Sequence, residues 1–262
     1  MPPTFDPGPR ACLLSFILAW SSLANYAQRP NALEVDSLTT ELQRAKEDTT
    51  KVNILNLLSE KAGWRVGNHD TCLVLAQQAY DLAKKAGFER GVAQAHSHMG
   101  MALWHKGELD EAMVQHEAAL KISQRLGDKG RIAASYANIG HVYKNRGDHT
   151  NAIKHYRLGV EMAEADGKKA LIGTLYNHIG ASLQKLGDPP GAMESNLAAL
   201  RIQEELGDSV GMSYSYNNIG LIHLNQGSYA EALESCRSAL AIVERLGNGG
   251  SVANTHIKLG NI

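Results

Sequence analysis

Polar side chains that could bind a peptide recur along this chain every 40 residues. Each stands two places before a repeated glycine and carries an amide, an imidazole or an ammonium group: His98, Asn138, His178, Asn218 and Lys258. A regular ladder of such groups can donate and accept hydrogen bonds along an extended peptide backbone. The spacing therefore indicates a surface that binds polypeptide.

The predicted neighbours of this ladder are also polar, and none is Asp or Glu. The candidate peptide-binding residues are His98, Asn138, His141, Lys144, Asn177, His178, Lys185, Asn217, Asn218, Asn225 and Lys258. Lysines in this set favour an acidic side chain or a terminal carboxylate on the ligand. The alternative interpretation is that a helix surface facing water is polar without any ligand, and that asparagine persists from the duplication of a repeat.

Other groupings of reactive residues lack the spacing that catalysis or metal binding requires. The stretch HEAAL from His116 begins like a zinc-protease helix, but Leu120 stands where the second histidine must be. His96 and His98 are two residues apart, so on a helix they point in roughly opposite directions. The GNGG stretch at 247–250 lacks the lysine of a phosphate-binding loop. We therefore expect no enzyme, no metal and no cofactor.

Composition narrows the fold and the class of partner. The chain of 262 residues is 44% hydrophobic and 20% charged, with a formal net charge of −1. Lysine and arginine are scattered, so no basic face is predicted for nucleic acid. Residues 31–188 contain no proline and are rich in helix-forming residues, which favours an all-α fold.

The repeated glycines point to paired helices. Tyr136, Ile139, Gly140 and Tyr143 fall at i, i+3, i+4 and i+7, so they share one helical stripe. A second glycine follows seven residues after each first one, and an alanine such as Ala152 follows five residues later. Because glycine within a helix costs about 1 kcal/mol relative to alanine, we expect it to bring two helices of a hairpin close together.

At these offsets the sequence resembles the tetratricopeptide repeat. The matching residues in the fourth unit are Tyr216, Ile219, Gly220, Gly227, Tyr229, Ala232 and Ala239. The period is 40 rather than 34 and the closing proline is missing, which resembles the longer-repeat branch of the kinesin light chain and the Pins-type adaptors. Six extra residues imply either longer helices or a longer hinge.

The resemblance implies a fold and a function. It implies an α-solenoid, a right-handed superhelix of helical hairpins, whose first helices line a concave groove for a protein or peptide ligand. Residues 93–262 would form four hairpins plus the first helix of a further repeat, and residues 51–92 a degenerate first repeat. The lysine and arginine set of the carboxylate-clamp form does not occur at the corresponding offsets, so the ligand of that form is disfavoured.

The N-terminal segment differs from the repeats. Residues 11–24, ACLLSFILAWSSLA, form an apolar stretch too short to span a bilayer. We expect residues 1–27 to be an export signal, with cleavage after Ala24 preferred and a retained anchor or a misassigned start as the alternative. Residues 28–50 are predicted to be a lead-in helix or a flexible linker. The mature chain is thus predicted to be periplasmic or otherwise extracytoplasmic.

The sequence ends at Ile262, inside a predicted first helix. We expect further sequence to follow in the whole protein. The architecture then resembles the exported sensor half of bacterial histidine kinases or nucleotide cyclases, which is the alternative function. Any membrane contact would come through that missing segment. Cys72 and Cys236 are expected to be buried and unpaired, because they lie on elements that cannot meet.

Overall fold

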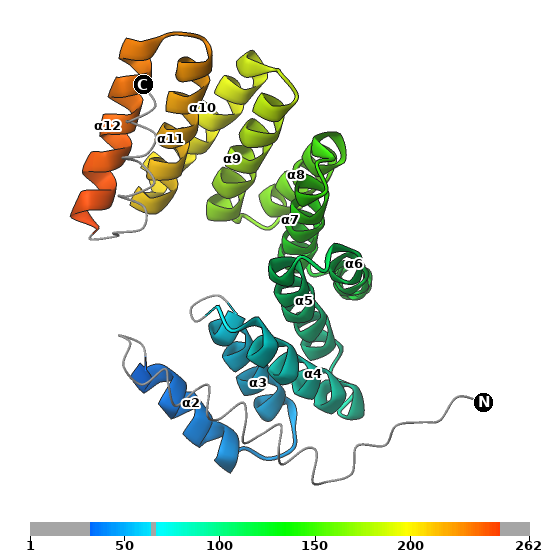
Figure 1. Ribbon diagram of the computed structural model, residues 1–262. Helices are drawn as coiled ribbons and strands as arrows, with labels where there is room; N and C mark the ends of the chain where they lie inside the picture. The colour runs from blue at the N-terminus through cyan, green and yellow to red at the C-terminus, as the bar shows by residue number, and fades with distance from the viewer. Residues whose placement is uncertain (1–31, 64–66, 247–262) are drawn as a thin grey trace. The chain divides into compact units, whose positions relative to one another are not determined.

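The computed structural model describes residues 32–63 and 67–246, and every regular element in these ranges is a helix (Figure 1). The helices are α2 (Ala32–Arg44), α3 (Thr49–Lys61), α4 (His69–Lys85), α5 (Glu89–Lys106), α6 (Leu109–Leu126), α7 (Lys129–Asn145), α8 (His149–Glu164), α9 (Lys169–Lys185), α10 (Pro189–Leu206), α11 (Ser209–Asn225) and α12 (Tyr229–Arg245). The predicted export signal, the GNGG stretch, the last repeat glycine and Lys258 lie outside the described residues.

The chain divides into two compact units, residues 1–122 and 123–262. In the first unit, α2 packs on α3, α3 on α4 and α4 on α5, and α3 also contacts α5. In the second unit, α7 pairs with α8, α9 with α10 and α11 with α12, and each hairpin packs on the next through α8 with α9 and α10 with α11. The fold is all-α, an α-solenoid of helical hairpins, as predicted.

The first helices of successive hairpins in the second unit lie next to each other. Helix α9 contacts α11, and side chains of α7 and α9 touch, as described below. The second helices α8, α10 and α12 make no comparable contact with one another within residues 123–246. Stacked hairpins that meet more closely on one side curve toward that side, so the first helices form the inner face of this unit.

A glycine and an aspartate form the turn between α7 and α8. Gly147 has a φ of +79°, a conformation that side chains with a Cβ disfavour. Its N–H bonds to Lys144 O at 3.0 Å, and the Asp148 N–H bonds to Tyr143 O at 3.0 Å, which together make a Schellman motif. The Asp148 side chain then accepts from the Asn151 N–H at 3.0 Å and caps α8.

The same left-handed glycine recurs every 20 residues from Gly67 to Gly227. From α4 onward the helices are 16 to 18 residues long. Short connections of two to four residues link them. The six residues beyond the usual repeat therefore lengthen the helices and do not make a longer hinge. The glycine spacing also continues through α3 and α4, the segment in which we predict a degenerate repeat.

Small and aliphatic side chains fill the core. In the second unit Ala133, Ala152, Tyr156, Leu175 and Ile179 belong to one buried cluster. Cys72 and Cys236 are both buried and free of disulfide bonds, as expected. Within the described ranges, no helix combines the length and the apolar character needed to cross a bilayer.

Candidate functional site

The repeated glycine of each first helix faces a side chain sixteen residues later, on the second helix of the same hairpin. The four pairs are Gly100 with His116, Gly140 with Tyr156, Gly180 with Asn196, and Gly220 with Cys236. A Cβ on Gly140 would lie 2.6 Å from Cδ1 of Tyr156, closer than real contacts allow. The predicted packing role of the glycine is confirmed.

The side chains opposite the glycines were missed by sequence reasoning. We expected the alanine stripe around Ala152 to face Gly140, and backbone at the equivalent alanines is indeed near: Ala192 O would lie 3.1 Å from a Cβ on Gly180. The larger neighbour is the residue sixteen positions on. Its fixed offset was the available signal, but its changing type, from imidazole to phenol to amide to thiol, hid the pattern.

In the hairpin α7/α8 this side chain belongs to a cluster of three rings, which we call the aromatic cluster: His141, Tyr156 and His178. The His141 and His178 rings are 4.6 Å apart between centroids and nearly perpendicular, at 82°. Tyr156 is fully buried and lies 5.5 Å from His141 and 5.4 Å from His178. The cluster thereby connects α7, α8 and α9, since each helix contributes one ring.

Burial sets the protonation of the groups at this cluster. Desolvation lowers the pKa of His178 to about 4, and the ammonium of Lys144 adds to that effect by repelling a second positive charge. Desolvation also lowers the pKa of Lys144 and raises that of the Tyr156 phenol. The Tyr156 hydroxyl is buried and has no hydrogen-bond partner within the described part of the chain. Near neutral pH, His178 is therefore an uncharged imidazole.

The next hairpin fills the same position with an amide. Asn196 is fully buried; its Nδ2 donates to Ala192 O at 2.7 Å, and its Oδ1 accepts from Asn218 Nδ2 at 3.0 Å. Nearby, Ser215 Oγ lies 2.8 Å from Asn177 Oδ1 and 2.6 Å from Gln203 Oε1. We call Asn177, Asn196, Gln203, Ser215 and Asn218 the amide network. It consists of two hydrogen-bonded groups, Ser215 with Asn177 and Gln203, and Asn196 with Asn218, which join α9, α10 and α11.

The structure places the predicted groove residues in four ways. Buried residues are Asn138, Asn177 and Asn217. Half-buried residues are His98, His141, Lys144, His178 and Asn218. Lys185 and Asn225 are exposed near the ends of α9 and α11, and Lys258 lies outside the described residues. Peptide binding by any of them stays a prediction.

Contacts between neighbouring hairpins explain why some of the amides are buried. Asn177 on α9 contacts Ser215 on α11, so its side chain lies between two first helices rather than over them. The structure brings His141, Lys144 and His178 together, and it brings Asn177 and Asn218 into the amide network. His98, by contrast, lies in the first unit.

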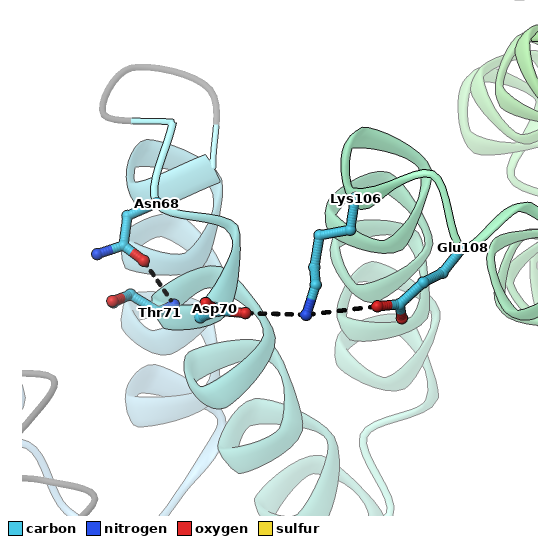
Figure 2. Close-up of polar contacts among 5 residues, drawn as sticks. All are labelled: Asn68, Asp70, Thr71, Lys106 and Glu108. Carbon is cyan, nitrogen blue, oxygen red and sulfur yellow. Dashed lines mark hydrogen bonds and ion pairs between the residues drawn. The ribbon is translucent and has the colours of Figure 1, made fainter.

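The first unit contains a lysine whose charge is already paired. Lys106 Nζ, at the end of α5, lies 2.9 Å from Asp70 Oδ1 and 3.5 Å from Glu108 Oε1 (Figure 2). The hydrogen bond and charge of Asp70 raise the pKa of Lys106. Asp70 follows Asn68, which caps α4 by accepting from the Thr71 N–H at 3.0 Å. Lys106 thus links the start of α4 to the end of α5.

Hollows on the second unit lie away from the predicted groove. Two of them lie against α8, and both are lined by Arg157 and Glu161. One hollow also carries Glu164 and Glu194, which give it an excess of acidic groups, and the other carries Lys154. None of the predicted groove residues lines them, so the candidate site rests on the chemistry of the first helices.

Comparison with known proteins agrees with the repeat pattern. One tetratricopeptide repeat family model matches residues 91–165 and another matches residues 213–246. A search of the curated proteins by sequence finds no match.

Several solved structures share the fold. BtubC (BKLC) from P. vanneervenii has a TM-score of 0.69 at 20% identity, covering 84% of this chain and 94% of that one. The apo form of RapI has a TM-score of 0.65 at 15% identity, covering 93% and 94%. Aspartyl phosphate phosphatase F from Bacillus subtilis has a TM-score of 0.68 at 15% identity, covering 94% and 68%. At these identities the likeness concerns the fold alone. The family models and the stacked hairpins identify residues 91–165 and 213–246 as tetratricopeptide repeats.

Proposed function

We propose that this protein is a non-catalytic scaffold that binds an acidic peptide segment of a partner protein along α7, α9 and α11. Tetratricopeptide repeats are protein-interaction modules, and this proposal adds the face and the charge of the ligand. One observation carries it: acidic residues are excluded from the first helices of the second unit.

The first helices of the second unit carry only basic charges, whereas the second helices carry both signs. Helices α7, α9 and α11 contain no Asp or Glu, and they carry five basic residues: Lys129, Arg131, Lys144, Lys169 and Lys185. Helices α8, α10 and α12 contain eight glutamates and five lysines or arginines. A surface facing water without selection on charge would carry both signs. The inner face of this unit is therefore suited to an anionic polypeptide.

A peptide array tests this proposal. Extended peptides of matched length, with Glu, Gln or Lys at the same positions, are probed with the protein and with two triple variants. The groove variant replaces Asn138, His178 and Asn218 with alanine. The control variant replaces the exposed Arg201, Glu204 and Glu234 of the second helices with alanine. We expect the Glu peptides to bind best, the groove variant to lose them and the control to keep them.

Two outcomes contradict the proposal. One is equal binding of Glu, Gln and Lys peptides, which would show that the charge of the first helices does not select the ligand. The other is unchanged binding by the groove variant with helical circular dichroism retained. Helicity is measured for both variants, so that loss of fold is distinguished from loss of binding.

The second part of the proposal concerns the cellular compartment in which the protein meets its partner. We place the partner outside the cytoplasm because of the apolar stretch at residues 11–24, a segment outside the described residues. Fusing residues 1–30 to alkaline phosphatase, an enzyme that requires export to fold, should give active phosphatase in the periplasm. Activity no higher than that of a fusion lacking residues 11–24 would contradict export.

A further inference from the structure

We infer that Lys144, His141 and His178 form a single carboxylate-binding subsite between α7 and α9, and that the bound carboxylate is held together with a proton on His178. The subsite rests on the proposed function, because it names the part of the groove that receives an acidic group of the peptide. That group is either a glutamate or aspartate side chain or the terminal carboxylate.

Lys144 is the first of three observations. Its side chain is half-buried on α7, one turn after His141. Within residues 67–246 no acidic group influences its pKa, which burial alone lowers. A partly desolvated ammonium without a counter-charge is costly, and a nearby carboxylate would offset that cost. Lys106 shows the opposite arrangement, since Asp70 and Glu108 already neutralise it (Figure 2).

His178 is the second observation. Its ring lies 4.6 Å from His141 and 5.4 Å from Tyr156, and it is close enough to Lys144 for that charge to oppose its protonation. A carboxylate placed between Lys144 and His178 would reverse that effect, because an opposite charge favours the imidazolium. The carboxylate would then accept hydrogen bonds from two cations, which are stronger than bonds between neutral groups.

The third observation is the set of charges around His178. From α7 it is faced by Lys144 and His141, and from α8 by Tyr156. Helix α9 carries lysines only at its ends, and α11 carries no Asp, Glu, Lys or Arg and has its one imidazole, His223, in the last turn. The charged residues of α10 are all exposed: Glu194, Arg201, Glu204 and Glu205. Glu161 and Glu164 of α8 are exposed as well, and among the described residues no carboxylate acts on the pKa of His178. A ligand would therefore supply the first.

Proton uptake follows from this geometry. Without ligand, His178 is neutral at pH 7 because its pKa lies near 4. A bound carboxylate raises that pKa, so binding takes up a proton from solvent wherever the pH lies between the free and the bound value. Affinity therefore increases as the pH falls through this window, by up to about tenfold per pH unit for one proton. At a pH above this window His178 stays neutral, and binding there uses Lys144 alone.

The test uses the full chain and three capped or uncapped pentapeptides of alanine. The first carries one central glutamate and blocked ends, the second carries glutamine in its place, and the third has a free terminal carboxylate and no glutamate. Ring resonances of His141 and His178 are followed by NMR during titration from pH 7.5 to pH 5.5. Comparing the first and third peptides distinguishes a side-chain from a terminal carboxylate.

We expect a carboxylate peptide to shift both ring resonances and to raise the pKa of His178, and the glutamine peptide to do neither. Lys144→Gln should weaken binding at least fivefold. Lys154→Gln removes an exposed lysine from α8, outside the predicted groove, and should change binding by less than twofold. His178→Gln should abolish the pH dependence while leaving weak binding by Lys144.

Three results would overturn the subsite. They are an unchanged His178 pKa at saturating glutamate peptide, equal shifts with the glutamine peptide, and equal losses in the Lys144 and Lys154 variants. The first is measured on the unaltered protein, so it does not depend on a variant that folds. If Lys144→Gln leaves the acidic preference of the peptide array intact, the subsite is wrong and the scaffold proposal stands. If the array shows no preference for acidic peptides but the His178 pKa rises, the scaffold proposal is wrong in its choice of ligand and the carboxylate subsite stands.

Discussion

In the hairpin α7/α8 the repeated glycine faces a phenol ring, whereas in α9/α10 it faces a primary amide. Both side chains are fully buried, and both lie beside the first helix of the next hairpin. Tyr156 fills its position with ring contacts and leaves its hydroxyl without a partner in the described residues. Asn196 fills the equivalent position with a donated and an accepted hydrogen bond.

The two regions therefore differ in how far their buried polar groups are satisfied by hydrogen bonds or counter-charges. In the amide network the polar groups bond mainly to each other, so they fix α9, α10 and α11 and have less capacity left for a ligand. At the aromatic cluster the rings exclude water without supplying a counter-charge. The pKa values of His178 and Lys144 are lowered there as a result. Burial without compensation is typical of sites that bind or react, which is why we place the carboxylate subsite at the first region.

The largest expected effect compares truncation of the two buried side chains. Tyr156→Ala should lower the free energy of unfolding by about 4 kcal/mol, because it removes a fully buried ring and leaves a cavity. Asn196→Ala should cost about 2 kcal/mol, since it leaves the Asn218 amide without its acceptor. Urea unfolding of both variants measures the difference. Equal losses would show that the two positions are filled equivalently.

The next effect is the pH dependence of stability. His178 has a folded pKa of about 4, below the 6.5 of an exposed histidine. The unfolded chain therefore binds more protons between these values, and the folded state loses stability as the pH falls from 6.5 to 4. The loss is at most about 3 kcal/mol. His178→Gln should remove it, so that the stability difference between variant and parent changes with pH.

His116 provides the internal check on this result. Burial also lowers its pKa to about 4, but it lies in the first unit, opposite Gly100. Its contribution is the same in the parent and in the His178 variant, so it cancels in the difference. A difference that stays constant from pH 7 to pH 4.5 would mean that His178 is accessible to solvent in the folded protein.

A smaller effect distinguishes packing glycines from the others. Gly140→Ala and Gly180→Ala should each cost about 2 kcal/mol, because the new Cβ meets the Tyr156 ring in one case and Asn196 and a backbone oxygen in the other. Gly130→Ala is the matched control, since its Cβ would meet only the flexible ends of the Asp166 and Lys168 side chains. That variant should be stabilised by up to about 1 kcal/mol through helix propensity. Thermal unfolding compares all three.

Local pattern in the sequence predicted most of the fold. The helices, their pairing, the packing glycine and the capping Asp148 all depend on offsets within one repeat, which recur four times. Ser228 is an exception: its residue type and its place at the N-cap of α12 favour a cap, but its side chain makes no capping hydrogen bond there. Position is therefore predicted more reliably than the bond that a side chain makes.

The candidate site was predictable only in part, because it depends on how hairpins stack. His141, Lys144 and His178 were all among the predicted groove residues, but their contact across α7 and α9 follows from the curvature of the unit. The burial of Asn177 has the same origin. The position of Tyr156 against His141 and His178 could not be read from periodicity either.

The smallest expected effect concerns single polar atoms in the two regions. Tyr156→Phe removes a buried hydroxyl that has no partner in the described residues, so it should leave stability unchanged or raise it by up to about 1 kcal/mol. Asn196→Leu keeps a similar volume in the other region but leaves the Asn218 donor unpaired, and it should cost about 2 kcal/mol. Urea unfolding at pH 7.5 measures both changes. A cost of 1 kcal/mol or more for Tyr156→Phe would mean that the hydroxyl is hydrogen-bonded in solution, for instance by a buried water. The buried hydroxyl of the aromatic cluster would then be satisfied as fully as the amides of the amide network.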